Sequence, residues 1–391
     1  MIYDAIIIGC GPAGAMAARV LALAGKSAIV LEQMPSAHGI VRSTGGSWAD
    51  ELIEMGIPET AIHRIKNGKI VSTKYEACKK TEGVCNIDMR ELQEHLAGQA
   101  RKSGAEILFN ATATEYAKKG DDGANKITYL KDGRKHEIKA RLVIDASGPS
   151  GFLARKHFGK IWKRVATGIE IETIPEKNNH QDEFIFILSR KLAPGGYCWV
   201  MPCKGRMKIG YTSIRPDFSV NVNETLEALL QTEFFKKYGK LKIIEKHGGI
   251  FPAEKPLEKL HGNDFLICGD AGSLGSQMVG EGVRFAMISG KMAGEYGIEF
   301  LDGKKDALKR YENEWRKKYA HDFSMGLLFQ KAVCKMNDSE LDSLVQMLDS
   351  IDYKILRRMF RTEFDLEVKK ELIKKGIGRI GLVWAVIRGI T

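Results

Sequence analysis

The chain has 391 residues, of which 44% are hydrophobic and 28% charged, as in an ordinary globular protein with one large core or two smaller ones. Its seven cysteines are odd in number and form no C-x-x-C pair, which argues against a disulfide framework or a zinc site and favours the reducing cytoplasm. The first eight residues are typical of a buried strand, not of a secretory signal, and the late apolar run 380–387 is far shorter than the ~20 residues that span a bilayer. We expect a cytoplasmic protein with no metal site and no transmembrane segment.

The formal net charge of +11 is concentrated towards residues 354–391, which carry ten basic and four acidic side chains. A basic surface beside apolar residues fits an anionic membrane face or a phosphorylated substrate. A solvated basic helix is the simpler interpretation. Nucleic acid is a third, but no known nucleic-acid motif accompanies the charge, so we expect no such partner.

In chain order, apolar periodicity predicts these elements: a buried strand at 2–8, a helix at 13–24, a strand at 27–31, a helix at 88–104, strands at 106–109 and 111–116, a hairpin of 126–129 and 136–139, and a buried strand at 141–144. Alternating segments between 161 and 260 indicate an antiparallel sheet with one helix at 223–238. A strand at 265–268, a helix at 280–299 and charged helices from 304 complete the chain.

This order predicts an α/β protein in three parts. Residues 1–160 and 261–303 form a discontinuous Rossmann-type dinucleotide domain, since the late strand and helix return to the first sheet. Residues 161–260 form an antiparallel β domain, which is the natural place for a substrate. Residues 304–391 form a C-terminal helical region.

A glycine-rich turn, Gly9-Cys-Gly-Pro-Ala-Gly14, joins the first strand to the first helix. Gly9 allows the tight turn, Gly11 lets the backbone approach a pyrophosphate, and Gly14 lets the helix pack closely on the strand. Glu32 ends the second strand, where a carboxylate accepts hydrogen bonds from ribose hydroxyls. Glutamate at this position favours an unphosphorylated ribose, and hence FAD or NAD.

Two later turns also place a carboxylate after a strand. Asp270 lies in the first of them, Ile267-Cys-Gly-Asp-Ala-Gly272, and Gly280-Glu-Gly-Val283 then opens the long helix. The second turn is Asp145-Ala-Ser-Gly148, for which closure of the strand and direct contact with a cofactor are equally open interpretations.

These motifs, in this order, resemble those of glutathione-reductase-like flavoproteins. The resemblance implies that FAD is the cofactor and that Asp270 binds its ribityl chain. It also implies that backbone amides at Gly280, Gly282 and Val283 lie beneath the flavin, where the start of the helix stabilises negative charge on the reduced ring.

Two further segments resemble signatures of the geranylgeranyl reductase family, flavoenzymes that saturate isoprenoid chains. Residues 40–46 stand where the family has V-R-C-G/A-E-G, which implies contacts with FAD from Arg42, Ser43, Thr44 and Gly46. Here serine replaces the family's cysteine and glycine replaces its acid.

The second segment, Tyr197-Cys-Trp-Val-Met-Pro202, resembles the aromatic-x-W-x-F-P substrate signature of that family, with Met201 in place of phenylalanine and with Gly205 and Gly210 after it. Alternation along a strand places Tyr197 and Trp199 on one face, where an aromatic wall suits a prenyl chain and stabilises developing positive charge. An aromatic strand in an ordinary core is the alternative.

Residue-by-residue comparison with the family adds Ala13 on the glycine loop and Ala113 as a backbone contact to adenine. It also assigns an arginine of the helix 88–104 to FAD, and we place that role on Arg90.

The resemblance implies a reductase that saturates isolated C=C bonds of geranylgeranyl chains in membrane lipids or prenyl compounds. Its electrons come from an external reductant, either NAD(P)H or a ferredoxin-like protein, and its lipid substrate gives the basic tail a role in peripheral contact with the inner face of the membrane. Tyr197, Tyr211 and Cys198 are candidate proton donors. A flavin-dependent monooxygenase or halogenase and a flavin electron-transfer protein are the alternatives, although the halogenase signature W-x-W-x-I-P is absent.

Overall fold

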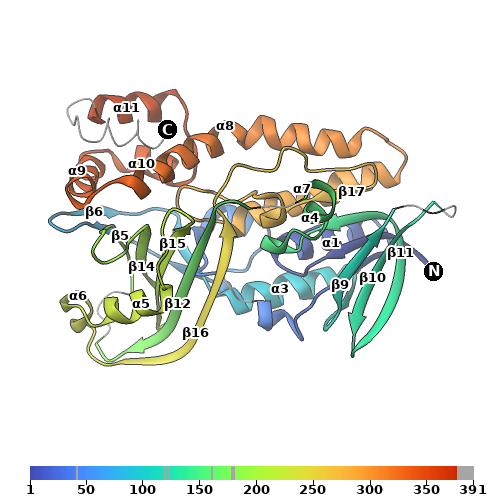
Figure 1. Cartoon of the computed structure of the whole chain (residues 1–391), viewed down its shortest axis with the longest axis horizontal. Coiled ribbons are helices and arrows are strands. Elements are labelled where there is room, and N and C mark those ends of the chain that lie inside the picture. Colours follow the sequence, from blue (N-terminus) through green and yellow to red (C-terminus); the bar gives the residue numbers. More distant parts are fainter. Residues whose placement is uncertain (41–42, 119, 121–122, 160–161, 178–180, 377–391) are drawn as a thin grey trace.

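The computed structural model describes residues 1–40, 43–118, 120, 123–159, 162–177 and 181–376. Two large sheets lie side by side, and the C-terminal helices run along one side of both (Figure 1). The first sheet has seven strands: β8 (Glu106–Leu108), β2 (Ala28–Leu31), β1 (Ile2–Ile8), β11 (Arg134–Asp145), β10 (Asn125–Lys131) and β9 (Thr112–Ala117) in spatial order, with β17 (Phe265–Ile267) paired to β11. The late strand therefore joins the first sheet, as predicted.

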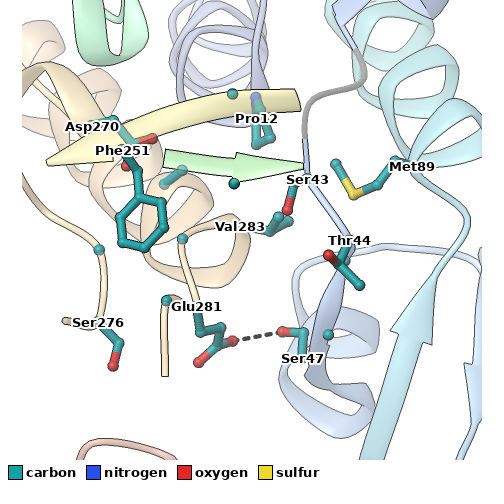
Figure 2. A pocket seen from close by; sticks show the side chains of 18 of the residues that line it. Pro12, Ser43, Thr44, Ser47, Met89, Phe251, Asp270, Ser276, Glu281 and Val283 are labelled. Atoms are coloured by element: carbon teal, nitrogen blue, oxygen red, sulfur yellow. Dashed lines mark hydrogen bonds between the residues drawn. The ribbon is translucent and has the colours of Figure 1, made fainter. Parts of the chain in front are cut away.

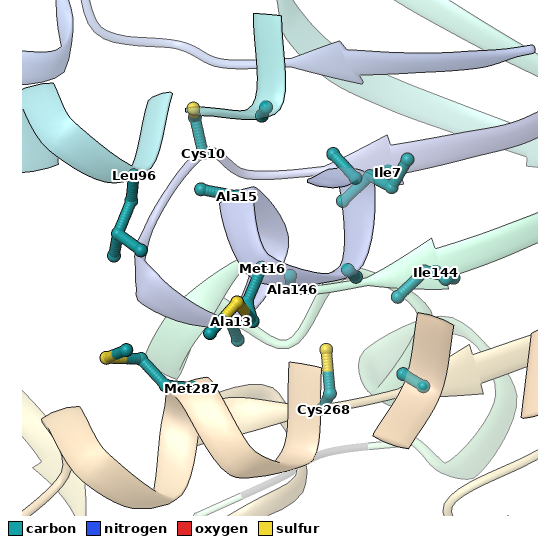
Figure 3. Packing of buried hydrophobic residues seen from close by; sticks show 14 of the residues in the cluster. Ile7, Cys10, Ala13, Ala15, Met16, Leu96, Ile144, Ala146, Cys268 and Met287 are labelled. Carbon is teal, nitrogen blue, oxygen red and sulfur yellow. The ribbon is translucent and has the colours of Figure 1, made fainter. Parts of the chain in front are cut away.

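Helices α1 (Pro12–Leu23), α3 (Met89–Lys102) and α7 (Val283–Leu301) cover one side of this sheet. Because Gly290 and Gly294 lie one turn apart on α7, α7 packs directly on α1; a Cβ at Gly290 would lie only 2.1 Å from the carbonyl oxygen of Ala13. Figure 3 shows Ala13 and Met16 of α1 packed beside Met287 and Cys268. This close packing fixes the starts of α1 and α7 next to each other.

The region before β17 differs from the prediction in one respect. The predicted hairpin arm at 136–139 and the buried strand at 141–144 are one continuous strand, β11. Its first half pairs antiparallel with β10, and its second half pairs parallel with β1 and β17. The strand changes its pairing partners without interruption, so the sequence pattern does not show that the two predicted segments form one strand.

The second sheet also has seven strands: β16 (Leu241–Pro252), β12 (Val165–Pro175), β15 (Arg206–Arg215), β14 (Gly196–Cys203), β13 (Glu183–Ile187), β5 (Asn67–Val71) and β6 (Glu76–Lys80) in spatial order. The hairpin β5–β6 precedes residue 161, so the sheet also draws on chain outside 161–260. The predicted helix 223–238 is two helices, α5 (Val222–Leu230) and α6 (Glu233–Lys236), separated at Thr232, whose hydroxyl donates to the Leu229 carbonyl at 2.7 Å.

The two faces of the second sheet have different environments. One face packs on α5 and α6 through a core that includes Ile171, Cys198, Ile209 and Tyr211. The other face turns towards the first sheet and carries the side chains described below.

The remaining elements are short, apart from the C-terminal helices. They are the small sheet of β3 (Gly46–Trp48), β7 (Val84–Ile87) and β4 (Ile62–Arg64), with α2 (Ala49–Glu54), α4 (Phe152–Phe158), α8 (Ala307–Lys335), α9 (Asp338–Asp349), α10 (Tyr353–Phe360) and α11 (Leu366–Gly376). A capping box of Asn337 and Glu340 begins α9. Among the helices in the described ranges, none has the length and apolar character to cross a membrane.

Candidate active site

A cavity of about 490 Å³ lies between the two sheets (Figure 2). Its walls combine the start of α1, the end of β2, the loop before β3, the start of α7 and the inner face of the second sheet. Most of the residues predicted to bind the cofactor or substrate line it: Gly9, Gly11, Ala13, Glu32, Ser43, Thr44, Gly46, Ala113, Tyr197, Trp199, Asp270, Gly280, Gly282 and Val283. The structure therefore brings together residues that lie far apart in the chain.

The glycine loop has the geometry that its motif predicts. Gly9 has a φ of +97°, which favours glycine, and a Cβ at Gly14 would lie 1.9 Å from the Gly9 carbonyl oxygen. Gly14 thus lies behind the cavity wall and lets α1 approach β1. A Cβ at Gly11 would meet no atom within 4 Å, so the space in front of Gly11 is free for a pyrophosphate. No side chain caps α1, and its first amides face that space.

Glu32 is buried at the end of β2 and connects two backbone segments. Its Oε2 accepts from the amide of Cys10 at 2.7 Å, and its Oε1 accepts from the amide of Met34 at 2.8 Å. Each carboxylate oxygen retains a second acceptor position, and the side chain lines the cavity. This is the arrangement that ribose hydroxyls require.

Asp270 lies in the turn directly after β17 and also lines the cavity. Among the described residues, no hydrogen bond to its carboxylate is present, and burial raises its pKa from 3.8 to about 6. A carboxylate without a protein partner at a cavity wall fits a ligand that brings hydroxyl donors, as a ribityl chain does. The amides at the start of α7 face the same space, and no side chain caps them.

A buried polar cluster holds β3 and α2 against the start of α7. Glu281 accepts from the Ser47 hydroxyl at 2.7 Å and pairs with the Arg284 guanidinium at 2.8 Å (Figure 2 shows the first contact). Arg284 also pairs with Glu51 of α2 at 2.7 Å. These contacts fix the position of Thr44 and Gly46 at the cavity.

The aspartate in the turn after β11 has a structural role. Asp145 is fully buried, and its carboxylate accepts from the amides of Ser147 at 3.1 Å and Leu153 at 2.7 Å. Burial raises the pKa of Asp145, and these hydrogen bonds partly offset the effect. The carboxylate therefore closes the turn, while Ser147 and Gly148 line the cavity.

Aromatic side chains of the second sheet form the opposite wall. Tyr197 and Trp199 lie on the same face of β14 with ring centroids 5.7 Å apart, and Phe186 and Phe251 lie nearby on the wall. The Tyr197 hydroxyl donates to the Val279 carbonyl at 2.6 Å. The predicted aromatic face is thus part of the cavity.

Residues 2–321 match the model of the FAD binding domain family. The chain belongs to that family. FAD is its cofactor, and the glycine loop, Glu32, Asp270 and the start of α7 fit the pyrophosphate, ribose, ribityl chain and flavin ring of FAD in turn.

Curated relatives from two methanogens are each named digeranylgeranylglycerophospholipid reductase. The protein from Methanosarcina acetivorans is 28% identical, with 95% of each chain covered, and the protein from Methanocaldococcus jannaschii is 28% identical, with 90% of this chain and 93% of the relative covered. The predicted resemblance to geranylgeranyl reductases is confirmed by these relatives.

Solved structures confirm the predicted fold class. A geranylgeranyl bacteriochlorophyll reductase-like protein from Thermoplasma acidophilum has a TM-score of 0.85 at 20% identity, with 98% of this chain and 99% of that chain covered. The flavin-dependent halogenase CmlS has a TM-score of 0.69 at 16% identity, with 99% of this chain and 72% of that chain covered. At these identities the likeness shows a shared FAD-binding fold.

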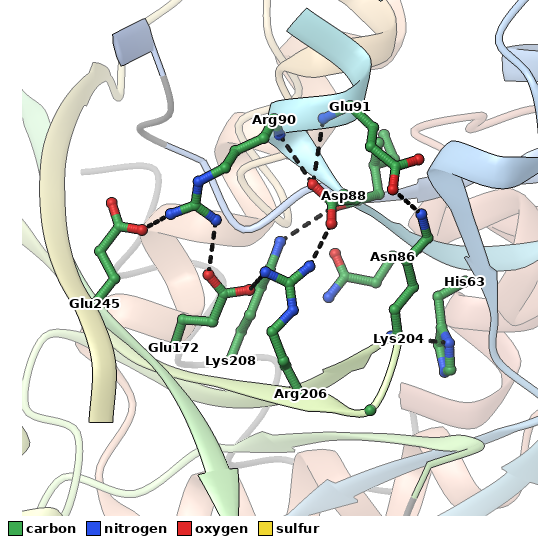
Figure 4. Close-up of polar contacts among 12 residues, drawn as sticks. His63, Asn86, Asp88, Arg90, Glu91, Glu172, Lys204, Arg206, Lys208 and Glu245 are labelled. Atoms are coloured by element: carbon green, nitrogen blue, oxygen red, sulfur yellow. Dashed lines mark hydrogen bonds and ion pairs between the residues drawn. The ribbon is translucent and has the colours of Figure 1, made fainter. Parts of the chain in front are cut away.

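Three residues predicted to bind FAD are not among those that line the cavity: Gly14, which lies behind the wall, Arg42 and Arg90. Arg42 lies outside the described residues. Arg90 is not among the lining residues, and its guanidinium pairs with Glu172 at 3.1 Å and with Glu245 (Figure 4), so its contact with FAD stays a prediction. Met89 lines the cavity instead, because it precedes Arg90 on the first turn of α3 and faces another direction.

The charged cluster around Arg90 joins α3 to the second sheet. Arg206 bridges Asp88, the N-cap of α3, and Glu172, with a distance of 2.9 Å to the latter (Figure 4). Beside it, the buried Lys208 ammonium donates to the carbonyls of Thr44 at 2.7 Å and Ile87 at 3.0 Å. The cluster therefore connects the sheet to the loop that is predicted to contact FAD.

Sequence reasoning missed several titratable residues of the cavity, and two of them, Glu170 and His247, lie opposite each other on neighbouring strands. Glu170 alternates with apolar residues along β12, which is also the pattern of a strand with one solvated face. Thr44 of the loop before β3 and Trp199 of β14 contact Glu170 on this face, and the acid is buried. The adjacent glycines of His247-Gly-Gly249 are a signal of close backbone approach that was available in the sequence.

Proposed function

We propose that this chain reduces isolated C=C bonds in the geranylgeranyl chains of lipids or related prenyl compounds. The observation that supports this proposal most strongly is that one cavity holds both the residues that fit FAD and a chamber of apolar and aromatic side chains. The chamber is lined by Ile70, Phe184, Phe186, Tyr197, Trp199, Phe251, Leu348 and Phe360. An isoprenoid chain matches such a lining, and a charged or strongly polar substrate does not.

Bound FAD in its reduced form supplies a hydride to one carbon of the double bond. The protein's part is to align the alkene, exclude water and stabilise the charge that develops on the other carbon. The faces of Tyr197 and Trp199 are suited to the last role, because aromatic rings attract positive charge. Burial raises the pKa of Tyr197, so its hydroxyl keeps its proton and its hydrogen bond to Val279.

The names of the methanogen relatives support this proposal, because they specify a lipid with geranylgeranyl chains. The strand Tyr197–Pro202 also lacks the tryptophan pair of the halogenase signature. The fold alone fits a monooxygenase or halogenase as well as a reductase, so the reaction has to be tested directly.

The test is anaerobic. The purified protein is reduced with dithionite and mixed with an unsaturated geranylgeranyl glycerolipid, and flavin absorbance and lipid mass are followed together. We expect flavin reoxidation that depends on the lipid. If the flavin stays reduced until air is admitted and the lipid then becomes hydroxylated, the chain is a monooxygenase.

An external reductant, either NAD(P)H or a ferredoxin-like protein, completes the proposed cycle. We further propose that the chain works in the cytoplasm and contacts the inner face of the membrane through its basic C-terminal segment. Residues 354–391 carry a net charge of +6, and residues 377–391 of this segment lie outside the described residues. A basic segment with apolar residues is attracted to anionic lipid surfaces.

A further inference from the structure

Three residues lie in one row across neighbouring strands of the second sheet. Trp199 of β14 is opposite Gly210 of β15, and Gly210 is opposite Glu170 of β12. The side chains of Trp199 and Glu170 both line the cavity. The row is therefore part of the wall that carries the aromatic side chains.

The indole of Trp199 crosses the row because its neighbours are glycines. A Cβ at Gly210 would be 2.1 Å from Cζ2 and 2.3 Å from Cε2 of Trp199, so the indole lies directly over Gly210. A Cβ at Gly168 of β12 would be 3.7 Å from Cη2 of the same ring. Glycine at position 210 thus leaves room for the indole to reach from β14 to β12.

Glu170 holds the far edge of this indole. It is buried, and its Oε2 accepts from Nε1 of Trp199 at 2.6 Å. Burial would raise the pKa of Glu170, but contacts with His247, Lys208 and Thr44 outweigh burial and hold this pKa below its usual value. Because an indole N–H can only donate, and because it is costly to bury without an acceptor, this contact fixes the orientation of the ring.

The same carboxylate oxygen holds the loop before β3. The Thr44 hydroxyl donates to Oε2 of Glu170 at 2.5 Å, and the Lys208 ammonium donates to the Thr44 carbonyl at 2.7 Å. Thr44 lines the cavity and is predicted to contact FAD. One oxygen of Glu170 therefore connects the aromatic wall to the loop that is predicted to contact FAD.

The other residues singled out on β14 and β15 lack this connection. Tyr197 lines the cavity, but its hydroxyl donates to the Val279 carbonyl. Cys198 and Tyr211, two of the proton donors expected from the sequence, lie in the core on the opposite face of the second sheet. Among these residues, Trp199 is the one that both lines the cavity and contacts Glu170.

We propose that Glu170 is a positioning residue, which fixes the indole of Trp199 against the substrate and holds the Thr44 loop at a set distance from that indole. This inference rests on the proposed function. Reacting atoms have to lie about 3–3.5 Å apart, so the substrate wall and the FAD side of the cavity must keep their separation. Glu170 acts through Trp199 and Thr44 and exchanges no proton or electron with the substrate.

The experiment compares Glu170→Ala and Glu170→Gln with Lys246→Gln, all as FAD-loaded full-length proteins. Lys246 lies on the neighbouring strand β16, but its side chain is exposed and pairs with Glu227. Each reduced protein is mixed anaerobically with saturating geranylgeranyl glycerolipid, and the rate of flavin reoxidation is measured. The dissociation constant of the lipid for each oxidised protein is measured separately.

We expect Glu170→Ala to lower the reoxidation rate by about 100-fold, which is the order of the cost of a misplaced reacting group. Lipid affinity should stay within about fivefold of wild type, because positioning acts on the reacting complex more than on binding. Glu170→Gln keeps an oxygen acceptor and should recover at least about tenfold of the loss, and Lys246→Gln should leave the rate unchanged. A fall of less than about tenfold in Glu170→Ala overturns the proposal.

A double-mutant cycle tests whether Glu170 acts through Trp199. Trp199→Phe keeps an aromatic ring but removes the N–H donor. Added to Glu170→Ala, it should lower the rate by less than about threefold further, because members of one hydrogen-bond network are not independent. Effects that multiply overturn the proposal. If Glu170→Ala does not fold, Glu170→Asp, whose carboxylate is too short to reach the indole, takes its place under the same criteria.

A second measurement does not depend on turnover. In protein with isotope-labelled tryptophan, the indole N–H resonance that is absent from Trp199→Phe belongs to Trp199, and its exchange with solvent is followed. Exchange should be at least about tenfold faster in Glu170→Ala than in wild type, because the N–H has lost its acceptor, and equal exchange overturns the proposal.

The two proposals fail in different ways. If wild-type protein shows no reoxidation by lipid, the proposed function fails and the role of Glu170 in it fails as well. An active wild type with an equally active Glu170→Ala contradicts only the role of Glu170.

Discussion

Replacing Asp270 with asparagine should have opposite effects on the stability of the FAD-free protein and on its affinity for FAD. Burial raises the pKa of Asp270 from 3.8 to about 6. This difference corresponds to about 3 kcal/mol of cost for the charged carboxylate at neutral pH. Water in the open cavity screens part of that cost, so we expect Asp270→Asn to stabilise the FAD-free protein by about 1–2 kcal/mol.

The stability difference between Asp270→Asn and the wild type should depend on pH. Below a pH of about 3 the carboxyl is mostly protonated in both the folded and the unfolded wild-type chain, and the cost nearly disappears. As the pH rises towards about 6 the unfolded chain loses this proton first, so the wild type loses stability relative to the variant. The advantage of Asp270→Asn should therefore be largest at about pH 8 and nearly disappear at about pH 3.

Urea unfolding of the FAD-free proteins at both pH values measures the stability, and fluorescence titration with FAD measures the affinity. Loss of one hydrogen bond to a charged acceptor costs about 1.5–3 kcal/mol, so FAD should bind roughly 10 to 150 times more weakly. Asp306→Asn, at an exposed position on the N-terminal side of α8, should change neither quantity. An Asp270→Asn variant that is less stable than wild type at pH 8, or that keeps its FAD affinity, would refute the reasoning.

Three further perturbations test other parts of the site. Gly14→Ala puts a Cβ 1.9 Å from a carbonyl oxygen of the glycine loop, so the affinity for FAD, measured by titration, should fall about 100-fold. The control Gly98→Ala, at an open helical position, should keep the wild-type affinity. Equal affinities in the two variants would contradict the packing argument. Lys208→Met removes a buried ammonium that holds two backbone carbonyls, and urea unfolding should show a loss of about 1–3 kcal/mol; a loss within error would mean that the loop is held by other contacts. Deletion of 376–391 should reduce activity on lipid in vesicles more than on a detergent-soluble analogue, and equal losses would exclude membrane docking by this segment.

The FAD-binding half of the cavity could be predicted because its signals are local. Gly9, Gly14 and Glu32 lie in one strand–helix–strand unit, where the geometry follows from neighbouring residues and from the tight turn. The roles expected of Asp270 and Gly282 came instead from the resemblance of their motif to that of glutathione-reductase-like flavoproteins.

The rest depends on contacts between residues far apart in sequence. The direction of Arg90 is set by Glu172 and Glu245, on strands that follow it by 82 residues or more, and the helix pattern alone does not reveal those partners. Likewise, Glu170 and His247 meet only because β12 and β16 pair in one register. An alternating strand has a polar face, but the sequence does not say whether water or another domain covers it.

The proposed reaction moves electrons from the reduced cofactor into the carbon–carbon double bonds of an isoprenoid chain. A single anaerobic turnover of dithionite-reduced protein with geranylgeranyl glycerolipid, followed by mass spectrometry of the lipid, tests it most directly. We expect one saturated double bond, with a gain of two hydrogens, for each flavin reoxidised. Unchanged lipid, or lipid that gains oxygen only after air is admitted, would contradict it.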